Sequence, residues 1–220
     1  MRRGKFELGK YQPVFSGEAE QEKQEKQEKL EKGTNPAKNL LDYLHDFVML
    51  LSGVLLVLLL LFRVVVVSGP SMKNTLIDGD YIILLSNVLY GEPKQGDIVV
   101  ASKDSFKDGE PIIKRIIATE GQEVDIDFDM GVVYVDGTPL DEPYTLTDTN
   151  LQEGIQFPII VEEGCVFVMG DNRNESKDSR NPEIGQVDCR EILGKALFLL
   201  FPGDNKKSID RDFTRIGVLS

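Results

Sequence analysis

The chain has 220 residues, of which 41% are apolar and 28% charged, a composition typical of a folded protein with one main domain. Its formal net charge is −12, and the acidic excess lies wholly after residue 38. This acidity argues against nucleic acid as a partner, because phosphate binding needs a basic face. The single histidine, His45, and the two cysteines, Cys165 and Cys189, exclude a metal site built from several His or Cys ligands, and no cofactor is expected.

Residues 1–38 are expected to form a charged cytoplasmic tail. Within them the repeat QEKQEKQEKLEK, residues 21–32, places glutamates four positions before lysines, which is the favourable order for ion pairs along a helix. Only Leu30 in the repeat is apolar, so no coiled-coil seam exists. The repeat is therefore either a solvated helix or a disordered segment, and turn residues at 34–36 end it.

The run FVMLLSGVLLVLLLLF, residues 47–62, contains no charge and predicts a membrane anchor. As a helix it would be about 24 Å long, which is short of a hydrocarbon core of about 30 Å. Either residues 40–43 before it or Val64 to Val67 after it must supply the remaining length, so the anchor is predicted at residues 40–67. Arg63 can extend its charged end to the lipid headgroups.

The position of this run and its flanking charges indicate an uncleaved anchor with a cytoplasmic N-terminus. A cleaved signal sequence is only 15–30 residues long, whereas this run begins at position 47. Lys29, Lys32 and Lys38 precede the run, and Lys73 alone follows within twenty residues of Arg63. The chain is therefore predicted to cross the cell membrane once, with everything after Arg63 outside the cytoplasm.

Beyond the anchor, the sequence consists of short β-branched segments bounded by turn residues, which is typical of β-strands. Asp78-Gly79 and Asp136-Gly137 are turn signals, and the second falls where a hairpin would need it. No amphipathic helix longer than a few turns follows residue 70. The predicted strands are 81–85, 97–101, 111–117, 131–135, 157–161, 165–169 and 192–201.

The predicted fold is therefore mainly β, with a single N-terminal transmembrane helix followed by an all-β extracytoplasmic domain. This β-rich domain is placed at residues 68–202, with a small inserted lobe at about 123–162 and a C-terminal tail at 203–220. Cys165 and Cys189 are either a disulfide, if the domain lies outside the cytoplasm, or two unpaired buried thiols.

The stretch VVVVSGPSMKNTL, residues 64–76, follows the apolar run directly, and Ser71 within it is either part of a linker or a nucleophile. The only histidine, His45, precedes the membrane span, so a Ser-His-Asp triad cannot form in the β domain. A nucleophilic Ser71 would need another base. Lysine is the usual substitute when its surroundings keep it neutral.

The segment PIIKRII, residues 111–117, offers a candidate for that base. The period of two in a strand puts Lys114 on one face with Ile112 and Ile116, and Arg115 on the other. A lysine on an apolar face is desolvated, which lowers its pKa. Chemistry rather than pattern selects Lys114, because an arginine cannot give up its proton in a protein. The alternative is an ordinary lysine on a half-exposed strand.

The polar segment GDNRNESKDSRNPE, residues 170–183, follows an apolar predicted strand. It is either a surface loop or a source of orienting groups for a site. A calcium loop fits poorly, because Arg173 falls where the second acidic ligand should be and Ser176 where the glycine should be.

Taken together, these segments resemble the bacterial type I signal peptidases, also called leader peptidases. The similar motifs occur in the family's order over residues 47–201: SGPSMKNTL at 68–76, GDIVV at 96–100, KRIIATEGQ at 114–122 and GDNRNESKDSR at 170–180. The resemblance implies a membrane-bound serine endopeptidase that removes signal peptides from exported preproteins by a Ser-Lys dyad. The implied partners are the signal peptides of secreted preproteins and the lipid bilayer.

The resemblance also implies a role for each matching residue. Ser71 would be the nucleophile, with its backbone N–H in the oxyanion hole, and Lys114 would be the general base. Ser176 would orient the lysine amine, and Asp178 and Arg180 would form the ion pair that holds the loop. The pockets for small side chains would be lined by Met72, Leu76, Ile112 and Ile113.

The chain departs from the family pattern at two positions. Asn74 stands where the motif has proline. Gly69, a supporting residue, stands where some members have a serine in the oxyanion hole, with Ser68 one position earlier; a second donor is then missing or supplied by backbone.

Two other functions compete with signal-peptide removal. A specialised or silent relative acting in pilus or surface-protein assembly would be favoured if Ser71 or Lys114 were absent, but both are present. A soluble self-cleaving repressor would share the Ser-Lys chemistry, but the anchor and the lack of an N-terminal DNA-binding pattern argue against it.

Overall fold

The structure, a computed structural model, describes residues 16–33, 36–106, 109–203 and 211–219. The chain divides into two compact units, Met1–Leu55 and Leu56–Ser220. The charged tail predicted at residues 1–38 falls partly on residues 1–15 and 34–35, which lie outside the described residues.

The glutamate–lysine repeat is helical and belongs to α1 (Ser16–Gly33). One of the expected ion pairs is present, because Lys26 Nζ lies 3.5 Å from Glu22 Oε1. Both side chains are largely exposed, so solvent screens the pair and its contribution to stability is small. Of the two alternatives for this repeat, the structure has the helix.

The apolar run belongs to α2 (Pro36–Leu61), which is long and apolar enough to cross a membrane. Its 26 residues rise about 39 Å, more than a hydrocarbon core of about 30 Å requires. The additional length comes from the N-terminal side. Val64 to Val66 instead lie in a strand, β1 (Phe62–Val66), so the helix ends six residues before the end predicted for the anchor at Val67. Arg63 lies in the same strand, paired with Leu84.

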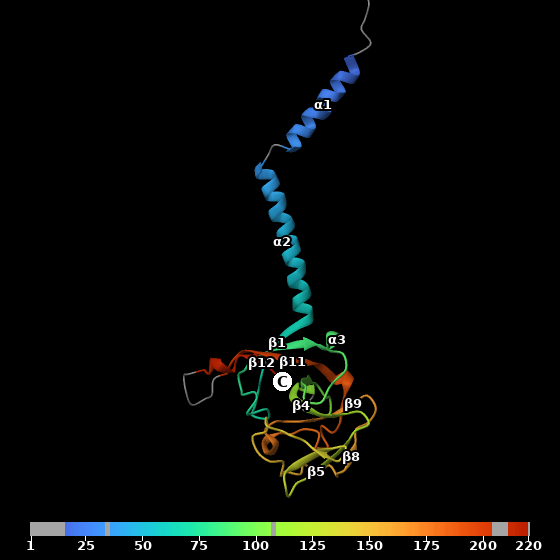
Figure 1. The fold of residues 1–220 in the computed structure, drawn as a ribbon, viewed down its shortest axis with the longest axis vertical. Helices are drawn as coiled ribbons and strands as arrows, with labels where there is room; N and C mark the ends of the chain where they lie inside the picture. The colour runs from blue at the N-terminus through green and yellow to red at the C-terminus, as the bar shows by residue number, and fades with distance from the viewer. Residues whose placement is uncertain (1–15, 34–35, 107–108, 204–210, 220) are drawn as a thin grey trace, which may run out of the picture. The chain divides into compact units, whose positions relative to one another are not determined.

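The valines form a strand because β-branched side chains suit a pleated surface and because a partner is available. That partner is the next strand along the chain, which pairs antiparallel with β1 over its whole length. The main sheet has the order β1-β2-β11-β3-β4-β9-β10, with β12 paired to β11. Of these strands, β1, β4, β9, β11 and β12 are labelled in Figure 1. Its other strands are β2 (Tyr81–Ser86), β3 (Ile98–Ala101), β4 (Ile112–Thr119), β9 (Cys165–Met169), β10 (Val187–Asp188), β11 (Ile192–Phe201) and β12 (Gly217–Val218).

A second sheet lies in the region predicted to form a small inserted lobe, with the order β7-β6-β5-β8. Its strands are β5 (Glu123–Asp127), β6 (Val132–Val135), β7 (Thr138–Pro139) and β8 (Ile159–Ile160). The hairpin between β6 and β7 turns at Asp136 and Gly137, whose φ angles of 52° and 71° are both positive, as a tight hairpin turn requires. The turn signal at these two residues therefore predicted a real hairpin.

Each of the seven predicted strand segments overlaps an observed strand, and the prediction of a mainly β protein with one N-terminal apolar helix is confirmed. Sequence reasoning missed the short strands β1, β10 and β12, and also β5, whereas β7 is the second strand of the hairpin predicted at Asp136–Gly137. In β5 only Val124 and Ile126 are buried and the other three residues are acidic and exposed, so the segment lacked an apolar run. The short helices are α3 (Asn87–Tyr90), η2 (Arg173–Glu175), η3 (Cys189–Glu191) and η4 (Phe213–Arg215).

Strand β4 contributes to three separate core clusters, which makes it the central element of the β unit. Ile112 and Ile116 belong to the first cluster, Ile117 to the second, and Ile113 packs against the third. The alternation of side chains along the strand directs the consecutive Ile116 and Ile117 to opposite faces, and so into different clusters. The strand is consequently covered on both faces, and its polar residues must find partners inside the protein.

The segment predicted as a C-terminal tail, residues 203–220, contributes to the main sheet. Within the described part, β12 pairs with β11 through Phe198 and Val218, and the Leu219 N–H donates to Leu197 O at 2.9 Å. A strand of two residues carries no periodic pattern, so the sequence offered no signal for it. Residues 204–210 and 220 lie outside the described residues.

The two cysteines are unpaired thiols in the structure. Cys165 packs against the second core cluster and Cys189 against the first. Burial raises the pKa of both thiols, which disfavours the reactive thiolate. Of the two alternatives for these residues, the structure has the unpaired one.

Candidate active site

Ser71 lies in the loop of residues 67–80 that connects β1 to β2. The ends of this loop are joined by backbone hydrogen bonds, Val67 N to Asp80 O at 2.8 Å and Gly79 N to Val67 O at 2.9 Å. Met72 and Leu76 anchor the middle, because both are buried in the third core cluster and the Leu76 N–H donates to Met72 O at 2.8 Å. The residue next to Ser71 is therefore held by the core.

The structure brings Lys114 of β4 to Ser71. The Lys114 Nζ atom lies 2.8 Å from Ser71 Oγ and 3.0 Å from Ile113 O. Lys114 is only 4% exposed, so this amine is almost completely removed from solvent. The backbone N–H of Ser71 donates to no acceptor among the described residues.

A cavity of about 440 Å³ opens beside this pair. It is lined by Val65 and Val66 of β1, by residues 68–71 and 110–114, and by Val100, Phe106 and Lys177. Ile112 and Ile113, two of the four residues predicted to line substrate pockets, belong to this lining. The other two, Met72 and Leu76, are buried in the core and act on the cavity only by anchoring the Ser71 loop.

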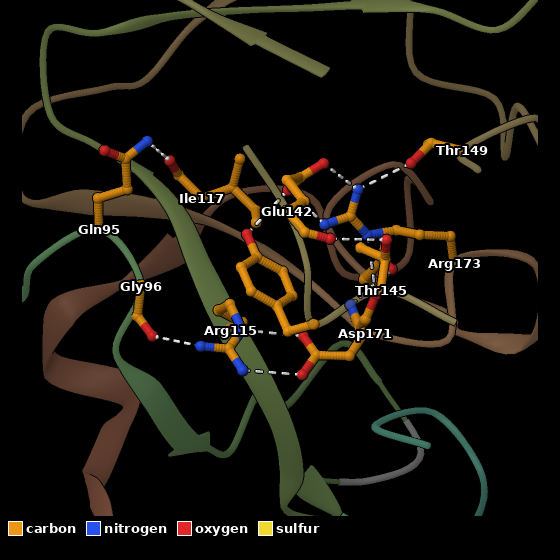
Figure 2. Close-up of polar contacts among 12 residues, drawn as sticks. Gln95, Gly96, Arg115, Ile117, Glu142, Thr145, Thr149, Asp171 and Arg173 are labelled. Carbon is orange, nitrogen blue, oxygen red and sulfur yellow. Dashed lines mark hydrogen bonds and ion pairs between the residues drawn. The ribbon is translucent and has the colours of Figure 1, made fainter. Parts of the chain in front are cut away.

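Arg115, the residue after Lys114, is directed to a different partner. Its guanidinium donates two hydrogen bonds to Asp171, both at 2.9 Å, and a third to Gly96 O at 2.9 Å (Figure 2). The guanidinium carbon lies 3.9 Å from the centroid of the Tyr144 ring. Arg115 and Asp171 are both buried, so the two consecutive basic residues of β4 meet different groups: Lys114 contacts Ser71 and Arg115 contacts Asp171.

Asp171 also contacts the Ser71 loop, a connection that sequence reasoning missed. The Thr75 hydroxyl donates to Asp171 Oδ2 at 2.5 Å. Asn172 makes a second connection, because its backbone N–H donates to Ser71 O at 3.0 Å and its side-chain amide to Pro70 O at 3.1 Å. The polar segment after β9 was the only signal for these residues, and it does not indicate which carbonyl or hydroxyl they would contact.

Asp178 and Arg180 form the expected ion pair in a fully buried environment. Arg180 Nε and Nη2 each lie 2.8 Å from an oxygen of Asp178, and both side chains are 0% exposed. Asp178 Oδ2 also accepts the Gly170 N–H at 3.0 Å, and Arg180 Nη2 donates to Arg173 O at 2.6 Å. The pair therefore joins the start of the loop to its end.

Ser176 is buried against Gly170 and the Ser71 backbone. A Cβ atom at Gly170 would lie 2.2 Å from Ser176 Oγ and 2.4 Å from Ser71 O, so only glycine fits at this position. The predicted contact of the Ser176 hydroxyl with the Lys114 amine stays a prediction.

The two departures from the family motif have structural counterparts. Asn74 has a φ of 96°, which a proline ring fixed near −65° cannot adopt, whereas asparagine tolerates the left-handed region. The Asn74 side-chain amide donates to Tyr144 O at 3.3 Å. Gly69 has a φ of 90°, its N–H donates to Asp78 Oδ1 at 3.0 Å, and it lines the cavity together with Ser68.

A third buried arginine, Arg173, connects the segment between β7 and β8 to the same loop. Arg173 pairs with Glu142 through contacts of 2.6 and 2.8 Å and donates to the Thr149 hydroxyl at 2.8 Å (Figure 2). Burial, followed by the charge of Glu142, raises the pKa of Tyr144, whose hydroxyl donates to that carboxylate at 2.9 Å. Within the described ranges, no group of three or more His, Cys, Asp or Glu residues is placed to hold a metal ion.

Comparison with known proteins gives consistent results. The family model for signal peptidase, peptidase S26, matches residues 40–201. The chain is 33% identical to signal peptidase I of Bacillus licheniformis, over 81% of this chain and 98% of the relative. It is 37% identical to signal peptidase I T of Bacillus subtilis (68% and 81%) and 38% identical to the probable signal peptidase I-1 of Synechocystis (68% and 79%).

The buried Asp178–Arg180 pair can be tested against an exposed pair with the same spacing. Asp178→Asn should lower the free energy of unfolding by about 1–3 kcal/mol, because Arg180 loses the carboxylate that it contacts at 2.8 Å and keeps only Glu153, at 3.5 Å, as a negatively charged partner. Asp188→Asn is the matched control: Asp188 pairs with Arg190 in the same i, i+2 arrangement but at the surface. Denaturant unfolding in detergent should show a much smaller change for the control. Equal changes in the free energy of unfolding for the two variants would contradict a stabilising role for the buried Asp178–Arg180 pair.

Proposed function

Because the chain belongs to the signal peptidase, peptidase S26 family of serine endopeptidases, we propose that it removes signal peptides from exported preproteins with Ser71 and Lys114 as a catalytic dyad. The observation that carries the proposal is the 2.8 Å contact between Lys114 Nζ and Ser71 Oγ beside a cavity whose lining includes no histidine. The named relatives are signal peptidases I, and the substrate class of this chain follows from them.

In the proposed reaction, the neutral Lys114 amine accepts the Ser71 hydroxyl proton as Oγ attacks the scissile carbonyl. The resulting tetrahedral oxyanion accepts a hydrogen bond from the Ser71 backbone N–H. As the C–N bond breaks, the Lys114 ammonium returns the proton to the amine of the mature protein, and the signal peptide remains as an ester on Ser71. Lys114 then takes a proton from water, whose oxygen attacks the ester carbonyl. When the ester bond to Ser71 Oγ breaks, the Lys114 ammonium returns the proton to Oγ, and the signal peptide leaves as a free acid.

The surroundings of Lys114 support its role as a base. The Lys114 side chain is 4% exposed and lies beside Ile112 and Ile113, and a charged ammonium loses most of its hydration in such a place, so burial favours the neutral amine. Ser176 is proposed to orient this amine, and the Asp178–Arg180 pair to hold the loop that carries Ser176. Gly69 would let the backbone approach the substrate, since its φ of 90° and open surroundings leave that side of the cavity clear.

The substrate is proposed to lie extended beside β4. Ile112, Ile113 and Val65 would bound pockets for small side chains, since a mostly apolar wall accepts such groups without unpaired polar atoms. Met72 and Leu76 would contribute by holding Ser71 at the edge of these pockets.

We further propose that α2 anchors the enzyme in the cell membrane, with residues 1–38 in the cytoplasm and the catalytic domain outside it. Ser71 follows Arg63 by eight residues, so the backbone limits their separation to about 28 Å. A nucleophile so close to the bilayer could reach a cleavage site just beyond the apolar core of a signal sequence. Exposed apolar side chains on β1, β2, β11 and β12 support contact with lipid, namely Val64, Val66, Tyr81, Phe201 and Val218.

Replacement of Ser71 tests the nucleophile. Detergent-solubilised Ser71→Ala should bind a preprotein but form product at least about 10³-fold more slowly than wild type, because no covalent intermediate can form. Ser105→Ala, which alters an exposed serine outside the cavity lining, should cleave at the wild-type rate. Undiminished cleavage by the purified Ser71→Ala variant would exclude this serine.

Replacement of Lys114 tests the base. The cleavage rate should rise with pH through one ionisation, because only the neutral amine accepts a proton, and this ionisation should lie below the ordinary lysine pKa near 10.4. Lys114→Met should abolish cleavage, and Lys114→Arg should not restore it, since a guanidinium stays protonated.

Two control variants belong to the same pH series. His45→Ala should leave the profile unchanged, and so should Lys73→Met, which removes an exposed lysine from the Ser71 loop. An active Lys114→Arg enzyme, or an ionisation that disappears with His45, would refute the dyad.

The proposed topology can be tested by limited proteolysis of intact spheroplasts. Protease added outside should cleave exposed sites in the catalytic domain, such as residues 104–105, and spare the repeat at residues 21–32. Disruption of the membrane should make the repeat accessible, which serves as the control. Protection of the catalytic domain combined with cleavage of the repeat in intact spheroplasts would reverse the assigned orientation.

A further inference from the structure

Asp80, the last residue of the Ser71 loop, is a fully buried carboxylate that receives donors from three parts of the chain. It accepts the Ile77 N–H at 2.8 Å and the Gly203 N–H at 2.6 Å. Arg215, in the C-terminal segment of residues 211–219, donates to its two oxygens at 3.0 and 2.7 Å. The end of the chain therefore neutralises the buried charge of the loop that carries Ser71.

Arg215 also contacts the loop backbone at Thr75. Its Nη2 atom donates to Thr75 O at 3.2 Å. The Thr75 hydroxyl donates at 2.5 Å to Asp171, the ion-pair partner of Arg115. Thr75 is thus held from two directions, by the C-terminal segment and by the Arg115–Asp171 pair. These two contacts add to the core packing of Met72 and Leu76 and to the Asn172 hydrogen bonds that hold the same loop.

Two further contacts bring the C-terminal part of the chain against the same loop. A Cβ atom at Gly203 would lie 2.3 Å from Asp78 O and 2.7 Å from Asp80 N, so the backbone there approaches the loop as closely as glycine allows. Leu219 packs against the third core cluster, which also contains Met72 and Leu76. The pairing of β12 with β11 holds the segment in this position.

We propose that the C-terminal segment is a clamp on the Ser71 loop and that Arg215 is a positioning residue for peptide cleavage. This inference rests on the proposed function of Ser71 and Lys114. Without Arg215, the loop loses its contact with the C-terminal segment at Thr75, and Asp80 keeps a buried charge without its cation. Ser71 Oγ then departs from its 2.8 Å contact with Lys114 Nζ, and displacements of this size have large effects on rate.

The chain offers a matched control in Arg211, another arginine of the same segment. Arg211 Nη1 donates to Pro202 O at 2.9 Å, and its guanidinium carbon lies 4.8 Å from the centroid of the Phe201 ring. These contacts are to the end of β11 and to the residue after it. Arg211→Gln therefore removes a charge of the same kind and leaves the Asp80 contacts in place.

The test compares Arg215→Gln, Arg215→Lys and Arg211→Gln in the full-length, detergent-solubilised protein with a preprotein substrate. Arg215→Gln should lower kcat at least about tenfold with KM within about threefold, because alignment of the reacting groups is lost while the substrate pockets remain. Arg215→Lys should recover part of kcat, since an ammonium still neutralises Asp80 but cannot bond both of its oxygens and Thr75. Arg211→Gln should match wild type.

Hydrogen exchange of the same variants separates positioning from loss of fold. In Arg215→Gln, the amides of residues 72–76 should exchange faster, while those of β4 and β9 should exchange as in wild type. A wild-type kcat in Arg215→Gln, or accelerated exchange throughout the β domain, would overturn the clamp. Because exchange is measured without substrate, it tests the clamp even if the Ser71→Ala and Lys114 variants disprove the dyad.

Discussion

The arrangement of the β unit depends on the buried ion pair between Arg115 and Asp171. Two charges removed from water are tolerated only when they are paired and their remaining donors and acceptors are satisfied. Here the guanidinium bonds both carboxylate oxygens and Gly96 O, and Asp171 accepts the Thr75 hydroxyl as well. The pair consequently sets the distance between β4, the segment after β9, and the loop that carries Ser71.

Two more buried arginine–carboxylate pairs lie around the loop after β9. Arg173 is paired with Glu142 of the small lobe, and Arg180 with Asp178 within the loop. Three buried arginines so close together require their carboxylates, because loss of one partner leaves an uncompensated charge costing several kcal/mol. This requirement makes the loop rigid without regular secondary structure, and rigid support is what a serine and a lysine need to remain within hydrogen-bonding distance.

Lys114 is also buried, but its surroundings differ from those of the three buried arginines. Lys114 and Arg115 are consecutive on one strand, so the alternation of the strand separates them and only the arginine meets the Asp171 carboxylate. The lysine contacts Ser71 Oγ and the Ile113 carbonyl oxygen, at the edge of a mostly apolar cavity. The chemistry that we propose uses this separation, because Arg115 supplies the cation that the buried Asp171 requires, while Lys114 is placed against Ser71.

The sequence alone determined the apolar helix, the seven main strands and the Asp136–Gly137 turn, because each of these depends on side-chain periodicity or turn chemistry that is local along the chain. It also indicated Ser71, Lys114 and the Asp178–Arg180 pair through motifs within short segments. Only the tertiary structure decided that Val64 to Val66 form a strand, that the C-terminal segment returns to the main sheet, and that Thr75, Asn172 and Arg215 hold the Ser71 loop. These contacts join residues far apart in sequence, up to 140 positions in the case of Arg215 and Thr75, and no local pattern encodes which distant group a buried polar side chain will meet.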